Sequence, residues 1–243
     1  MKAGFTFLNL FFLLIVLFSI PLIVHGQQNT LWDYPIKPGM EEWATLRTKK
    51  QMIDACQIPL EILNNSNTKD LVTICLNYPM FNDYLIFNNE RKGICVMIQR
   101  FNGLMELSQR ENKIPELIQA YSNFPILTQL QKDPTSKEYH LPYKLPFLEL
   151  VLCDTLFLNK MNNDELEELR VIALNKYVSE LQNPDVYSLF NIKKTMLLIA
   201  SVIIRQNNAT ILPEQQDTLK TFIESYNYCS HNLLIEVSKI ITL

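Results

Sequence analysis

Apolar residues recur at helical spacing along almost all of residues 47–243, and no stretch of strand-like alternation competes with them. One such face consists of Leu71, Ile74, Cys75 and Tyr78, which fall three and four positions apart. The pattern predicts an all-α protein. We expect antiparallel helical hairpins that pack as a bundle or as a short solenoid of the HEAT or armadillo type.

Helix-capping residues and prolines divide this pattern into segments. The expected helix starts are Thr48, Asn67 or Thr68, Asn89, Asn162 or Asn163, and Pro213, and a last helix is expected from about Ser230 to Ile241.

A polar, proline-bearing stretch at residues 132–145 separates short segments from longer ones. We predict a linker there, between an N-terminal helical half (47–131) and a C-terminal half (146–243). A single continuous domain over 47–243 is the alternative.

The C-terminal half contains a weak internal repeat. A buried helix is predicted from Pro146 to about Lys160, and Phe147–Lys160 overlays Lys194–Asn207 at an offset of 47 residues. A period of about 40–47 residues is typical of HEAT and armadillo repeats.

The first 26 residues have the organisation of a secretory signal peptide. Lys2 provides the positive start, an apolar run follows to Val24, and Pro21 breaks it before a Val24-x-Gly26 cleavage site. We therefore expect export to the periplasm or the medium, with cleavage near Gly26. An uncleaved membrane anchor is the alternative, because about 20 apolar residues can also cross a bilayer.

Residues 27–46 form a polar, proline-containing lead-in, and we expect Trp32 and Trp43 to dock it onto the helical body. After residue 30 no apolar stretch reaches spanning length, so no stable membrane span is expected once the leader is removed.

Charge and glycine content argue against several function classes. Without the leader, 21 Lys and Arg face 25 Asp and Glu, a net charge of −4 that lacks the positive excess typical of nucleic-acid binding. Only Gly39, Gly93 and Gly103 remain, so there is no glycine-rich phosphate loop and no nucleophile elbow. The sequence predicts no cofactor.

The five cysteines match no zinc or C-x-x-C spacing. Cys75, Cys95 and Cys153 sit among aliphatic residues, which predicts buried thiols. A single Cys56–Cys75 bridge is the alternative in an oxidising compartment.

Two histidines follow the leader, and neither forms a recognisable metal site. His231 stands beside Ser230 and Cys229, an arrangement that could supply a nucleophile and its base. Adjacent side chains on a helix do not face each other, so we interpret His231 as a residue of the capping region. His140 lies in the predicted linker and is expected to be exposed.

The carboxylates also have structural explanations. The acidic residues of 164–168 lie at a helix start, where negative charge is favourable. Glu41 and Glu42 beside Trp43 suit sugar or peptide binding, but we prefer to interpret them as part of an N-terminal segment that is packed onto the helical body. We therefore assign no catalytic, cofactor or metal residue from the sequence.

Two sequons and one aromatic group complete the features of the sequence. Asn64 and Asn208 begin glycosylation sequons in predicted loops. An aromatic group could line a groove, although its spacing favours a core wall; it consists of Tyr78, Phe81, Tyr84 and Phe87.

Four short motifs carry a resemblance to a known group of proteins. They begin at Lys37 (KPGMEEW), Ala55 (ACQIP), Leu76 (LNYP) and Phe101 (FNG). Over roughly residues 35–125 the chain resembles uncharacterised exported α-helical proteins of Bacteroidetes. This resemblance implies bacterial export and no known activity, so it assigns no functional residue.

We expect an exported, non-catalytic helical scaffold that presents a groove to a protein or glycan partner. The alternative is a hydrolase-type enzyme with a dispersed site, formed by carboxylates such as Glu149 and Asp154 or by Cys229 with His231.

Overall fold

The computed structural model describes residues 31–129, 140–206 and 211–243, and within these ranges the protein is all-α, with no β-strand. The predicted signal peptide, the sequon at Asn208 and most of the predicted linker lie outside the described residues. In chain order the elements, including the 3₁₀ helices η1 and η3, are α2 (Glu41–Thr45), α3 (Lys49–Ala55), α4 (Leu60–Asn65), α5 (Thr68–Leu76), η1 (Phe81–Ile86), α6 (Glu90–Arg100), α7 (Asn102–Gln109), α8 (Lys113–Ser122), α9 (Leu141–Leu152), α10 (Thr155–Leu158), α11 (Asn163–Gln182), α12 (Leu189–Gln206), α13 (Pro213–Ser225), η3 (Tyr226–Tyr228) and α14 (His231–Ile241).

The capping residues expected from the sequence begin the helices as predicted. The Thr48 and Asn162 side chains each form a reciprocal capping box with the residue three positions later. Asn67, Asn89 and Ser230 accept backbone N–H groups at the starts of α5, α6 and α14. These side chains satisfy amide groups that a helix leaves without an internal partner.

Helix α9 begins at Leu141, five residues before the start predicted at Pro146. Pro146 lies inside this helix and has no N–H to donate to the carbonyl of Pro142, four residues earlier. The buried Asn191 amide of α12 donates to that carbonyl oxygen at 2.5 Å instead. A tertiary contact thus replaces the missing helical hydrogen bond, so the last five residues of the predicted linker are helical.

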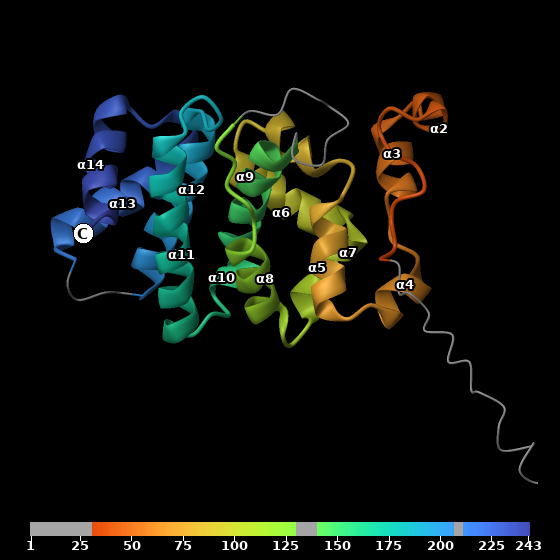
Figure 1. Cartoon of the computed structure of the whole chain (residues 1–243), viewed down its shortest axis with the longest axis horizontal. Coiled ribbons are helices and arrows are strands. Elements are labelled where there is room, and N and C mark those ends of the chain that lie inside the picture. Colours follow the sequence, from red (N-terminus) through yellow and green to blue (C-terminus); the bar gives the residue numbers. More distant parts are fainter. Residues whose placement is uncertain (1–30, 130–139, 207–210) are drawn as a thin grey trace, which may run out of the picture. The chain divides into compact units, whose positions relative to one another are not determined.

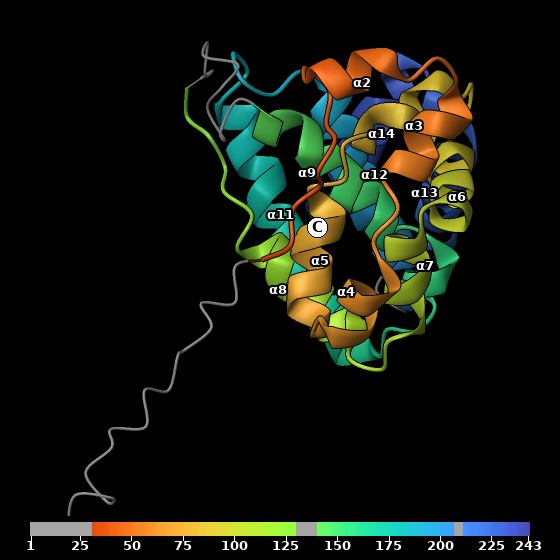
Figure 2. The ribbon, with the colours of Figure 1, turned by 90° about the vertical axis from the view of Figure 1, so that its right-hand side faces the viewer.

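One hydrophobic core includes residues from both sides of the predicted linker, from Tyr34 to Ile241. Helix α9 packs against α6, α8 and η1, which precede it in the chain, and against α12, which follows it. Figure 1 shows α11 and α12 side by side, and Figure 2 shows α5 next to α8. From Trp32 onward, the residues that the structure describes form a single compact unit.

The two segments of the proposed internal repeat differ in structure. Helix α9 ends at Leu152, and the Asp154 side chain caps the short α10 by accepting the Leu156 N–H. The matching part of α12 continues without a break to Gln206.

The N-terminal lead-in docks onto the body, as its tryptophans suggested. Trp32 and Trp43 are partly buried against the core. Tyr34 between them is 3% exposed, and its hydroxyl donates to the Ile74 carbonyl at 3.0 Å. Glu41 and Glu42 belong to the first turn of α2.

Motifs that carry the resemblance contact one another in the structure. The Asn102 side chain accepts the Ile58 N–H at 2.9 Å and donates to the Ile58 carbonyl at 2.7 Å. Tyr78 stacks on Phe101 with 4.0 Å between ring centroids. These contacts bring the segments that follow α3 and α5 to the start of α7, so three of the four motifs have a structural explanation.

The aromatic group is mainly a core wall, as preferred: Tyr78, Phe81 and Tyr84 are buried, and Phe87 is partly buried. Asn64 lies inside α4, a helix that the sequence analysis did not predict, so the expected loop at this sequon is wrong.

All five cysteines are free in the structure. Cys56, Cys75 and Cys153 are buried, whereas Cys95 is exposed, contrary to the prediction. Burial raises the pKa of the Cys153 thiol to about 12, which suits a thiol that stays protonated.

Candidate functional site

The Cys229 and His231 side chains do not form a nucleophile and base in this structure. The Cys229 thiol lies 3.4 Å from the Tyr226 carbonyl oxygen, to which it donates. His231 is the exposed first residue of α14, as the capping interpretation required. His140 is the exposed N-cap residue of α9, and partial burial together with the charge of Lys144 lowers the pKa of its imidazole.

The acidic residues at the start of α11 have structural contacts. Glu165 completes the capping box with Asn162, and Glu167 forms an ion pair with Arg170 at 2.7 Å. This pairing lowers the pKa of Glu167 to about 2.

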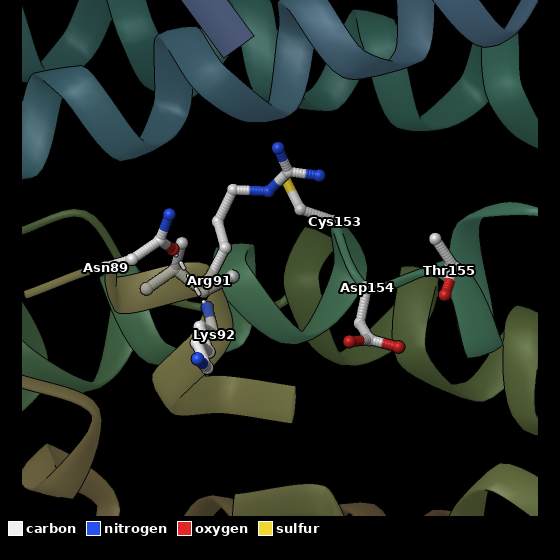
Figure 3. Close-up of a pocket in the computed structure, with 7 residues that line it drawn as sticks. Asn89, Arg91, Lys92, Cys153, Asp154 and Thr155 are labelled. Carbon is white, nitrogen blue, oxygen red and sulfur yellow. Dashed lines mark hydrogen bonds between the residues drawn. The ribbon is translucent and has the colours of Figure 1, made fainter. Parts of the chain in front are cut away.

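The enzyme hypothesis requires Glu149 and Asp154 to meet in one pocket, but the two residues lie in different surroundings. Asp154 caps α10 and lines a pocket of about 290 Å³ with Asn89, Arg91 and Cys153. In Figure 3 the Arg91 side chain extends toward the Cys153 thiol, while Asp154 points away from both. Glu149 is completely buried.

Glu149 instead forms a buried carboxyl pair with Glu180, which we call the acid pair. Both residues are 0% exposed. The Thr195 hydroxyl lies 2.8 Å from Glu149 Oε1 and 2.7 Å from Glu180 Oε2, and it therefore bridges the two side chains. The Tyr121 hydroxyl donates to Glu149 Oε1 at 2.8 Å. Helices α8, α9, α11 and α12 thus meet at one polar cluster inside the core.

Burial dominates the electrostatics of the acid pair. It raises the pKa of Glu180 to about 7. Burial, followed by the negative charge of Glu180, raises the pKa of Glu149 well above its usual value. Lys176 lies nearby, and its ammonium donates to the Phe124 carbonyl at 2.6 Å and sits 5.1 Å from the Tyr121 ring centroid. Burial lowers the pKa of Lys176, and the two carboxylates act in the opposite direction.

A signal for Glu180 is present in the sequence. Leu166, Leu169, Ala173, Lys176 and Glu180 follow one another at intervals of three and four, so the apolar face of α11 continues directly into two charged residues. Charged residues are rarely buried without a partner.

A second polar cluster lines a pocket of about 320 Å³, which we call the Lys194 pocket. Its lining comes from α6, α12 and the η3 region, and consists of Glu90, Leu189, Phe190, Lys193, Lys194, Tyr226 and Asn227. None of these residues was singled out as a site residue from the sequence, because Glu90 of α6 is more than 100 residues from Lys194 and from Tyr226 in the chain.

The Lys194 ammonium is held at the centre of this pocket lining. Its side chain is 2% exposed, and Nζ lies 3.0 Å from Glu90 Oε2 and 3.0 Å from the Phe190 ring centroid. The Tyr226 hydroxyl donates to the same Glu90 oxygen at 2.8 Å. Lys193 lies over the Tyr226 ring at 5.1 Å.

Burial lowers the pKa of Lys194 to about 8, and Glu90 partly opposes this shift. Burial and the charge of Glu90 raise the pKa of Tyr226. With one carboxylate and two ammonium groups, the ionised lining carries a net charge of +1.

Within the described ranges, no group of three or more His, Cys, Asp or Glu side chains is arranged to hold a metal ion. No helix of those ranges is both long and apolar enough to cross a membrane.

Comparison of the chain with protein-family models, with curated proteins and with solved structures gives no significant match. The candidate sites therefore depend on the geometry of this chain alone: a buried acid pair that joins four helices, and a lysine-containing pocket with aromatic walls.

Proposed function

We propose that the protein is an exported, non-catalytic helical scaffold that binds an acidic glycan through the Lys194 pocket. The observation that carries this proposal is a buried lysine set between aromatic rings in a pocket whose ionised lining has a net positive charge. A volume of about 320 Å³ falls at the lower end of the range of about 300–1,000 Å³ for small-molecule sites.

The lining matches the chemistry of an acidic sugar. The exposed Leu189 and the partly exposed Phe190 offer apolar surface to a sugar, and the Asn227 amide offers a donor and an acceptor for hydroxyl groups. Glu90 is already bonded to Lys194 and Tyr226, whereas Lys193 stands at the pocket as a partly exposed cation. A ligand carboxylate beside Lys193 would complete the charge balance.

The burial of the acid pair supports binding rather than hydrolysis as the main activity. Both carboxyl groups are 0% exposed, so a substrate can reach them only after the four surrounding helices open. General acid–base catalysis needs a carboxyl within hydrogen-bond reach of the substrate.

Calorimetric titration tests the proposal with two matched oligosaccharides, one containing uronic acid residues and one containing the corresponding neutral sugars. We expect the acidic oligosaccharide to bind and the neutral one to bind at least tenfold more weakly. Lys193→Gln should weaken acidic binding about fivefold, because an exposed ion pair contributes up to about 1 kcal/mol. Lys239→Gln, an exposed change on α14, should leave the affinity unchanged.

Equal affinity for the two oligosaccharides, or equal effects of the two lysine variants, would contradict the assignment. Slow cleavage of either sugar during the titration would support the hydrolase alternative.

Export is part of this proposal, and the leader and the resemblance to exported helical proteins support it. The protein for the titration is therefore purified from its native host and weighed intact. A mature chain that begins at Gln27 is the expected result, whereas a retained leader would indicate a membrane-anchored form.

A further inference from the structure

If both Glu149 and Glu180 were ionised, the bridge between them would have one hydrogen for two short contacts. Thr195 Oγ1 lies within 2.8 Å of a carboxyl oxygen on each side, but a hydroxyl has one hydrogen and can donate to only one of them. An ionised carboxylate has no hydrogen and only accepts. The second short contact therefore requires a proton on one of the two carboxyl groups.

The Tyr121 contact indicates where this proton lies. Tyr121 donates to Glu149 Oε1, which makes that oxygen an acceptor. A consistent chain then runs from Glu180 Oε2–H to Thr195 Oγ1, and from the Thr195 hydroxyl to Glu149 Oε1. Each short contact in this chain has one donor and one acceptor.

We propose that the acid pair is a binding site for a single proton, retained near neutral pH, and that loss of this proton loosens the packing of α9, α11 and α12. This inference concerns a different part of the protein from the Lys194 pocket and does not depend on the proposed function.

The unpaired oxygens of the acid pair support a neutral partner in it. Glu149 Oε2 and Glu180 Oε1 are buried and have no hydrogen-bond partner in the described part of the chain. A second negative charge would therefore be placed on a carboxyl group that lacks both water and a full set of donors, which is costly in a protein interior.

The charged groups around the pair balance one carboxylate but not two. Lys176 of α11 acts on both Glu149 and Glu180. Lys194 of α12 also interacts with Glu149, but its ammonium is paired with Glu90 of α6.

The other titratable groups that interact with the pair are uncharged at neutral pH, because burial raises the pKa of each of them. They come from η1, α8, α11 and the segments after α9 and before α12, and are Tyr84, Tyr121, Cys153, Tyr177 and Tyr187. None of these groups supplies a second positive charge.

Lys176 also gives the site a short route to solvent. Besides its position beside the acid pair, it lines a surface pocket of about 300 Å³ with Phe124 and Asn175. We place the exchange of the proton with solvent at this pocket, because Lys176 is the residue that it shares with the surroundings of the acid pair.

The sign of the pH effect follows from the raised pKa values. In the unfolded chain a glutamate loses its proton near pH 4.5, whereas Glu180 in the folded protein does so at about 7. The folded state therefore holds more protons in this interval, and its stability falls as pH rises from about 4.5 through 7. Glu149, whose folded pKa is also raised, extends the decrease to higher pH.

Urea unfolding between pH 5 and pH 8.5 tests the proposal with the full-length protein and its Glu180→Gln variant. The glutamine amide reproduces the protonated carboxyl group and can donate to Thr195. We expect the unfolding constant of the wild type to rise about tenfold per pH unit relative to the variant between pH 5 and 7. Glu168→Gln, an exposed change on α11, should follow the wild type.

Two further measurements keep the test decisive if Glu180→Gln folds poorly. Infrared difference spectra of the wild type should show a protonated carboxyl band that begins to lose intensity as pH rises through about 7 and loses the rest at higher pH. Amide hydrogen exchange at pH 8.5 should be faster in α9, α11 and α12 of the wild type than in Glu180→Gln. Parallel stability curves, or a wild-type spectrum without that band at pH 6, would overturn the proposal.

Discussion

At the scale of single residues, the protein buries polar side chains in positions that the helical pattern marks as interior. Glu149, Glu180 and Thr195 share one hydrogen-bonded bridge, and Asn191 supplies a hydrogen bond that Pro146 cannot. Each buried group acts on a residue from another helix. The effect of changing one of them therefore depends on its partner.

The Asn191 contact gives a residue-scale prediction. Asn191→Ala should cost about 1–3 kcal/mol of unfolding free energy, because it leaves the Pro142 carbonyl buried without a donor. In a Pro146→Ala background the new backbone N–H can donate to this carbonyl. We therefore expect the Asn191→Ala cost to be about 1 kcal/mol smaller there. Urea unfolding of the four proteins measures this difference, and strictly additive costs would contradict the explanation.

At the scale of elements, some helices approach each other closely at a glycine. At Gly93 of α6, an added Cβ would lie 2.7 Å from the Tyr84 carbonyl oxygen and 2.9 Å from its Cα. These are backbone atoms of η1, so the two elements can remain in contact only if the position stays glycine. At Gly103 of α7 the nearest atoms instead belong to the Phe101 and Ile58 side chains.

Alanine substitutions at these two positions test the element-scale argument. Gly93→Ala should destabilise the protein by about 1–3 kcal/mol, because a backbone clash outweighs the gain in helix propensity. Gly103→Ala, the same change in another helix, should cost less, since side chains adjust more easily than a backbone. Thermal and urea unfolding compare the two variants, and a larger loss at Gly103 would reverse the expected order.

At the scale of the whole molecule, one core includes the docked lead-in and the C-terminal helix α14. Both tryptophans, Trp32 and Trp43, lie in the lead-in, whereas most helical residues lie elsewhere. Tryptophan fluorescence and far-ultraviolet circular dichroism therefore report on different parts of one structure.

We expect the fluorescence and circular dichroism transitions to coincide in a urea titration, because the two parts share buried contacts such as Tyr34 with Ile74. Tyr34→Phe removes this hydrogen bond and should lower both midpoints together. A fluorescence transition at clearly lower urea concentration would show that the lead-in unfolds separately.

Part of the candidate sites was within reach of the sequence. The spacing of α11 carries its buried face from Leu166 to Glu180, and Glu149 stands inside an apolar run. Periodicity identifies such positions as buried but does not show which residue they meet. The Lys194 pocket lay beyond this reasoning, because Glu90 and Tyr226 are 136 residues apart in the chain.

The sequence by itself determined the helical class, the capped starts of helices such as α5 and α11, and many of the buried positions. These features depend on interactions within about four residues, such as the Asn162 cap and the i, i+3, i+4 spacing of apolar side chains. Only the tertiary structure decided that α9 starts before Pro146, that two glutamates share one threonine, and that Lys194 meets Glu90. The reason is that each of these outcomes depends on a partner from a distant helix, and no local pattern specifies which partner a buried polar group will find.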